Sequence, residues 1–114
     1  MFKINAVTCA PKTSIVAIEG SIDLSNVAKL KEALDTLFKE GVYKIILDFE
    51  KVSFIASAGL GCLLTARDVA LKHAGAMVFA GMSSRVREVF DLLGITSLLR
   101  FAPDLAGARA QLES

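Results

Sequence analysis

Residues 43–49, YKIILDF, constrain the fold of this chain more strongly than any other part of its sequence. The segment is mostly apolar and rich in residues that favour strands, and polar residues follow it at Glu50 and Lys51. A strand with one solvated face alternates apolar and polar side chains, whereas a nearly continuous apolar run is typical of a strand buried on both faces. The rest of the chain is therefore expected to supply helices that cover a sheet.

The segments around this strand alternate between the strand period and the helix period. Period-2 patterns over residues 2–9 and 14–19, joined by the turn-like Ala10-Pro11-Lys12, predict an antiparallel hairpin. Residues 76–80 and 98–101 are predicted as further strands. Helical spacing predicts four buried helix faces: Val27, Leu30, Leu34, Leu37 and Phe38; Leu60, Leu63, Leu64 and Leu71; Val86, Val89, Phe90 and Leu93; and Leu105, Ala108 and Leu112.

Residues that favour helix N-termini precede these patterns, namely Ser25 or Asn26, Ser57, Ser83 or Ser84, and Asp104. The predicted order of elements is ββαβαβαβα, a hairpin followed by alternating helices and strands. This order predicts an α/β fold with a mixed central sheet and helices packed on it. The chain of 114 residues, 54% apolar and 22% charged, is expected to form a single domain over residues 1–114.

Charge and hydropathy exclude several classes of partner. The chain has 13 Lys and Arg residues against 12 Asp and Glu, without a basic run, so direct nucleic-acid binding and polybasic membrane anchoring are not expected. The longest uncharged stretch, residues 52–66, is too short and too polar for a transmembrane segment, which needs about 20 apolar residues. The first ten residues do not follow the pattern of a signal peptide. These features predict a cytoplasmic protein.

The chain is also poor in residues that perform catalysis or bind metals. It has one histidine, His73, which is expected in the last turn of the second helix as a solvated side chain. Cys9 and Cys62 lack C-x-x-C spacing and are expected to be free thiols. We therefore predict that the protein is not an enzyme and that it holds no metal and no cofactor.

The tight connection predicted at residues 54–59 is the main candidate for function. Gly59 and Gly61 open a helix after a strand, but the sequence lacks both G-x-G-x-x-G and the lysine of a P-loop. Ser57 has two interpretations: it caps the helix, or it places a hydroxyl where the helix N-terminus would tolerate a phosphate. Asp23, after the second strand, also has two interpretations. It has a structural role, as a helix cap or in a turn, or it is a polar contact for a partner.

Residues 45–64, IILDFEKVSFIASAGLGCLL, resemble the STAS domain, the fold of bacterial anti-sigma factor antagonists. The family motif is a strand ending D-x-x-x-V-x-F-hydrophobic, followed by D-S-[ST]-G-hydrophobic-G at the start of a helix. It is matched by Asp48, Val52, Phe54, Ile55, Ser57, Gly59, Leu60 and Gly61. Similar matches extend over nearly the whole chain, at residues 20–23 and at Val86, Phe90, Leu93, Gly94 and Ile95.

The resemblance implies a protein that binds an anti-sigma factor of the serine kinase type and so frees a sigma factor to regulate transcription. The implied binding surface comprises Asp23, Phe54, Ile55, Ala56, Ser57, Ala58, Gly59, Leu60 and Gly61. At the position of the family's usual phosphoacceptor this chain has Ala58, and at the position of the motif aspartate it has Ala56. We therefore expect no phosphorylation switch at residue 58. Ser57 is the remaining candidate for phosphorylation. The alternative is a STAS scaffold, or a module that binds a small ligand or lipid, within a stress-sensing or transport complex.

Overall fold

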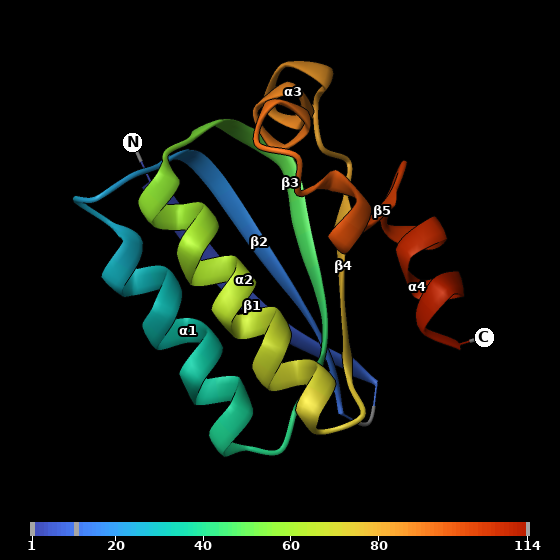
Figure 1. Ribbon diagram of the computed structural model, residues 1–114. Helices are drawn as coiled ribbons and strands as arrows, with labels where there is room; N and C mark the ends of the chain where they lie inside the picture. The colour runs from blue at the N-terminus through green and yellow to red at the C-terminus, as the bar shows by residue number, and fades with distance from the viewer. Residues whose placement is uncertain (1, 11, 114) are drawn as a thin grey trace.

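The computed structural model describes residues 2–10 and 12–113, so Pro11 of the predicted hairpin turn lies outside the described residues (Figure 1). The elements in chain order are β1 (Phe2–Ala10), β2 (Thr13–Ile22), α1 (Val27–Lys39), β3 (Lys44–Ile55), α2 (Ser57–Lys72), β4 (Ala76–Ala80), α3 (Ser84–Leu92), a 3-10 turn (Thr96–Leu98), β5 (Arg100–Ala102) and α4 (Leu105–Glu113). This order confirms the predicted α/β fold.

The strands form one mixed sheet in the order β1-β2-β3-β4-β5. β1 pairs antiparallel with β2, as the predicted hairpin requires, and the three remaining pairs are parallel. β3 is the central strand, and Ile45, Ile46 and Leu47 are each fully buried. Ile45 and Leu47 belong to one core and Ile46 to the other, because successive side chains of a strand point to opposite faces. The prediction of a strand buried on both faces is confirmed.

The helices cover the two faces of the sheet unequally. α1 and α2 lie side by side over one face, and the core beneath them is dominated by large side chains (Figure 1). There the ring of Phe79 packs edge-on against Phe49 at 5.2 Å and against Phe90 at 5.5 Å between centroids. α4 packs on the other face, against β3, β4 and β5, and its core is rich in alanine. α1 and α2 therefore pack on the face of the sheet that carries the larger core.

The structure corrects several predicted boundaries. β3 continues to Ile55, beyond the predicted end at Phe49, because β2 and β3 stay paired through two register irregularities. The predicted strand at residues 98–101 is shorter, since the 3-10 turn takes residues up to Leu98. Leu71 and Leu93, both predicted inside, are exposed. Leu93 follows the last residue of α3, and Leu71 lies in the last turn of α2, so neither packs on the sheet.

Candidate partner-binding site

Pairing of β2 with β3 brings together two segments that are far apart in the sequence. Ile22 lies opposite Ile55 in the register, and the Ala56 amide donates a hydrogen bond to the Ile22 carbonyl at 2.8 Å. The Ser21 and Ser53 hydroxyls also lie within 3.4 Å of each other. The β2–α1 loop, which carries Asp23, therefore lies beside the start of α2 at the upper edge of the sheet (Figure 1).

The connection between β3 and α2 is shorter than the predicted loop at residues 54–59. Phe54 and Ile55 end β3, Ala56 is the one connecting residue, and Ser57 is the first residue of α2. Ser57 is therefore not the cap that the sequence suggested, because Ala56 occupies that position with extended backbone angles. The methyl group of Ala56 cannot accept a hydrogen bond, so the first turn of α2 has no side-chain cap.

Two large apolar side chains on the segments that meet near this helix start are exposed to solvent. Leu24 is 81% exposed in the β2–α1 loop, and Phe54 is 51% exposed at the end of β3. Sequence reasoning missed Leu24, although an apolar residue between polar residues in a turn was a signal for it. By contrast, Ile55 and Leu60 are buried in the main core, so they position the site and offer no side-chain surface.

The two glycines of α2 have different roles. A Cβ atom at Gly59 would lie 2.6 Å from Cγ2 of Ile22 and 3.0 Å from Cγ1 of Ile55, closer than packed carbon atoms approach. Gly59 is therefore needed for α2 to pack against the ends of β2 and β3. A Cβ atom at Gly61 would meet nothing within 4 Å, so this glycine leaves open surface instead.

Ala58 and Gly61 open onto a groove between α1 and α2. The groove has a volume of about 620 Å³ and is lined mainly by small and apolar residues: Val27, Ala28, Lys31, Leu34, Asp35, Phe38, Ala58, Gly61, Cys62, Thr65, Ala66 and Val69. Lys31 donates to Asp35 at 2.6 Å on its rim, and this hydrogen bond raises the pKa of Lys31. Burial raises the pKa of the Cys62 thiol, which is therefore neutral at pH 7. The groove thus offers a largely uncharged surface next to residue 58.

Asp23 forms a turn, as one of its two interpretations predicted, and does not cap α1. Its Oδ1 accepts hydrogen bonds from the Ser25 hydroxyl at 2.5 Å and from the Ser25 amide at 2.9 Å, and these bonds lower the pKa of Asp23. The N-terminal position of α1 is taken by Asn26, whose side chain instead binds the Asp23 amide and the Ser21 carbonyl. The expected side-chain cap from Ser25 or Asn26 is therefore wrong. The Asp23 carboxylate remains charged at neutral pH.

The other chemically active residues lie apart from this edge. His73 Nδ1 bonds the Val69 carbonyl at 2.9 Å, and its ring stacks on Tyr43 at 4.1 Å near the opposite end of α2. Cys9 and Cys62 are free thiols. Within residues 2–10 and 12–113, no three His, Cys, Asp or Glu side chains gather as they would around a metal ion. Over the same residues, no helix combines the length and the hydropathy that a membrane span requires.

The fold and this edge define a class of small α/β domains in which a mixed sheet presents one helix start beside a polar turn. The family described as the STAS domain matches residues 6–108, and the chain belongs to that family. The resemblance seen in the sequence is thereby confirmed.

Curated relatives and solved structures agree with this assignment. BtrV of Bordetella bronchiseptica, named as an anti-sigma factor antagonist, is 26% identical over 100 residues, which are 88% of this chain and 86% of BtrV. The anti-sigma-B factor antagonist of Staphylococcus aureus is 26% identical over 84 residues, 74% of this chain and 78% of that protein. The crystal structure of an anti-sigma factor antagonist from Mycobacterium paratuberculosis superimposes with a TM-score of 0.88 at 19% identity, covering 100% of this chain and 96% of the other. At that identity the likeness is one of fold.

Proposed function

We propose that the protein is an anti-sigma factor antagonist that binds an anti-sigma factor of the serine kinase type and thereby frees a sigma factor. Both relatives described above are named as anti-sigma factor antagonists, which supports this proposal. The proposed contact surface comprises Asp23, Leu24, Phe54, the first two turns of α2 and the adjoining mouth of the α1–α2 groove.

The observation that carries this proposal is the exposure of Leu24 and Phe54 on the two segments that meet where β2 and β3 end. Exposed apolar side chains that cluster beside polar groups are typical of protein-binding surfaces. The fixed charge of Asp23 adds an anchor for a basic group of the partner. The small side chains of Ala56, Ala58 and Gly61 allow the backbone of a partner to approach closely.

The same surface supports binding that phosphorylation at residue 58 does not switch. A phosphate would add about −1.5 to −2 charges at pH 7, which desolvation and repulsion would oppose in an apolar interface. Ala58 has no hydroxyl to modify. Ser57 is exposed at the first position of α2, so a kinase that reached this serine would restore a switch one residue earlier.

The experiment that tests this function is affinity capture from the native cell extract with and without ATP, using a matched pair of variants. Leu24 and Leu92 are both 81% exposed, but Leu24 lies in the proposed surface and Leu92 lies at the end of α3. We expect the unmodified protein and Leu92→Asp to capture an anti-sigma factor with a kinase fold, and Leu24→Asp to lose it. Mass spectrometry identifies the captured protein and reports any phosphate on Ser57.

Two results would contradict the proposal. Equal capture by Leu24→Asp and by the unmodified protein would place the contact elsewhere on the molecule. Recovery of membrane-transport subunits in place of an anti-sigma factor would favour the scaffold interpretation of the STAS domain.

A further inference from the structure

A second surface lies on the flank of the molecule, where β1 forms one edge of the sheet. β1 is first in the strand order and pairs only with β2, so the other side of its backbone is open to a further strand. Proteins usually protect such an edge with prolines, bulges or short strands. β1 has nine residues without a proline, and its register with β2 is regular from Phe2 to Thr8. By comparison, the opposite edge strand, β5, has three residues.

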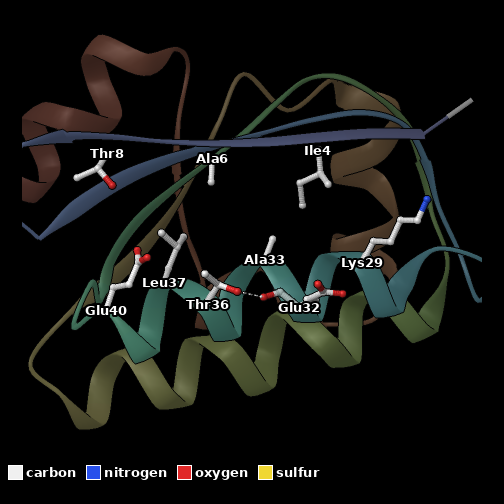
Figure 2. Close-up of a pocket in the computed structure, with 9 residues that line it drawn as sticks. All are labelled: Ile4, Ala6, Thr8, Lys29, Glu32, Ala33, Thr36, Leu37 and Glu40. Atoms are coloured by element: carbon white, nitrogen blue, oxygen red, sulfur yellow. Dashed lines mark hydrogen bonds between the residues drawn. The ribbon is translucent and has the colours of Figure 1, made fainter.

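A groove runs along this edge between β1 and α1 (Figure 2). Its volume is about 600 Å³. Figure 2 shows the side chains of Ile4, Ala6 and Thr8 pointing from β1 toward α1. An extended segment added to β1 would point every second side chain into this groove, because alternate residues of a strand share a face.

The groove carries carboxylates that lack partners. Glu32 lines it from α1 and Glu40 from the position just after α1, and neither forms a salt bridge within the described part of the chain. Glu40 is eight positions after Glu32, which corresponds to about 12 Å along a helix axis. Four residues of an extended strand cover about 13 Å, so basic residues at positions i and i+4 of a docked segment match this spacing on the groove side. Lys29 lies beyond Glu32, at the Ile4 end of the groove (Figure 2).

We propose that the β1–α1 groove is a docking site for an extended segment of a partner protein, with basic residues at i and i+4 and an apolar residue between them at i+2. The segment extends the sheet by backbone hydrogen bonds to β1, the apolar side chain packs over Ala6, and the two basic side chains pair with Glu32 and Glu40. This site is separate from the proposed anti-sigma surface and does not depend on it.

A second copy of this chain fits the groove less well. Ile4 pairs with Ile18, which faces the main core, so the neighbouring Lys3 points to the opposite face of the sheet, away from Glu32 and Glu40. Antiparallel pairing of two β1 strands would therefore bring no basic side chain of β1 to the groove.

The test uses the peptide Ac-TSKTVTKST-NH2 and amide shifts of the isotope-labelled protein at low salt. We expect shifts in residues 4–8 on titration, and binding about fivefold weaker for Glu32→Gln/Glu40→Gln, since exposed ion pairs contribute modestly. The matched control Glu88→Gln/Glu113→Gln changes the net charge equally at exposed sites outside the groove and should retain binding. The peptide Ac-TSKTVKTST-NH2, whose lysines point to opposite faces of a strand, should bind more weakly.

Backbone pairing is tested on the peptide itself, so the fold of the protein is not at risk. Two methylated peptides are compared. One carries methyl groups on the backbone nitrogens of residues 3, 5 and 7, and the other on those of residues 4, 6 and 8, so the two peptides have opposite edges of the added strand blocked. We expect one isomer to lose binding and the other to keep it. Equal binding of both isomers, equal binding of the two lysine spacings, or self-association of the protein through β1 would overturn the proposal.

Discussion

The starts of α2 and α3 both follow a strand at the same edge of the sheet, yet they are built differently. At α3 the Ser83 hydroxyl accepts a hydrogen bond from the Val86 amide at 3.2 Å, so the helix is capped. At α2 the corresponding position is Ala56, and no side chain caps the helix. The uncapped start also follows the strand end that carries the exposed Phe54, and the exposed Leu24 follows the neighbouring strand.

This difference separates residues that stabilise the fold from residues that form a surface. A serine or aspartate at an N-cap adds about 1 kcal/mol to stability, and α2 forgoes this contribution. Its stability depends instead on packing, because Gly59 lets the helix approach Ile22 and Ile55. A helix start that packs tightly inside and carries no polar cap outside suits the apolar contact proposed for α2.

The largest expected effect comes from filling the space at Gly59. Gly59→Val should lower the free energy of unfolding by about 3 kcal/mol, because its Cβ would overlap the buried Ile22 side chain. Gly61→Val is the matched control on the same helix and should change stability by less than about 1 kcal/mol, because its Cβ meets open space. Urea unfolding followed by circular dichroism measures both values. Equal losses for the two variants would show that Gly59 is not the close contact.

The second prediction concerns a charge placed at residue 58. Ala58→Asp should keep the fold, because an acidic side chain in the first turn of a helix interacts favourably with the helix dipole. It should weaken binding of the captured anti-sigma factor by about 30-fold, or about 2 kcal/mol, because the charge enters an apolar groove.

Ala58→Asn is the control for residue 58, since it has a similar size and no charge. Calorimetric titration should give it an affinity within about threefold of the unmodified protein. If the asparagine variant lost as much affinity as the aspartate variant, side-chain size and not charge would control binding at this position.

The third prediction removes the cap that distinguishes α3. Ser83→Ala should lower the free energy of unfolding by about 1 kcal/mol, because the Val86 amide loses its acceptor. Ser84→Ala, one residue further along and already within α3, should have an effect below about 0.5 kcal/mol. Chemical denaturation of both variants checks the difference. The capture of a partner should be unchanged in both, so a loss of capture by Ser83→Ala would extend the contact surface to α3.

The order of strands and helices could be predicted from the sequence because its signals are local. Each of these signals depends on residues close together in the sequence: the apolar run of β3, the helical spacing of α1 and the serine before α3. The apolar pattern alone ends this strand at Phe49, and only the family motif implied that it reaches Phe54 and Ile55. The register irregularities that carry β3 past Glu50 depend on pairing with β2, about 30 residues earlier in the chain. The grooves on both sides of α1 likewise exist only after α1 packs on the sheet.

The smallest expected effect comes from adding the side-chain cap that α2 lacks. Ala56→Asp places a carboxylate at the N-cap position, where it can accept from the amides of the first helical turn. We expect the free energy of unfolding at pH 7 to rise by about 0.5 to 1 kcal/mol. The hydrogen bonds lower the pKa of the new carboxyl in the folded state, so the gain is present above its unfolded pKa of about 3.9 and is lost as the pH falls through the folded value.

Unfolding measured at pH 7 and at pH 3 separates this cap from other causes. Ala56→Asn should gain a similar amount at both values of pH, because an amide caps without titrating. If neither variant were more stable than the unmodified protein, the start of α2 would already be satisfied by solvent, and its lack of a cap would carry no cost. If Ala56→Asp gained stability and lost its partner, the apolar helix start would be a feature that binding requires at the expense of stability.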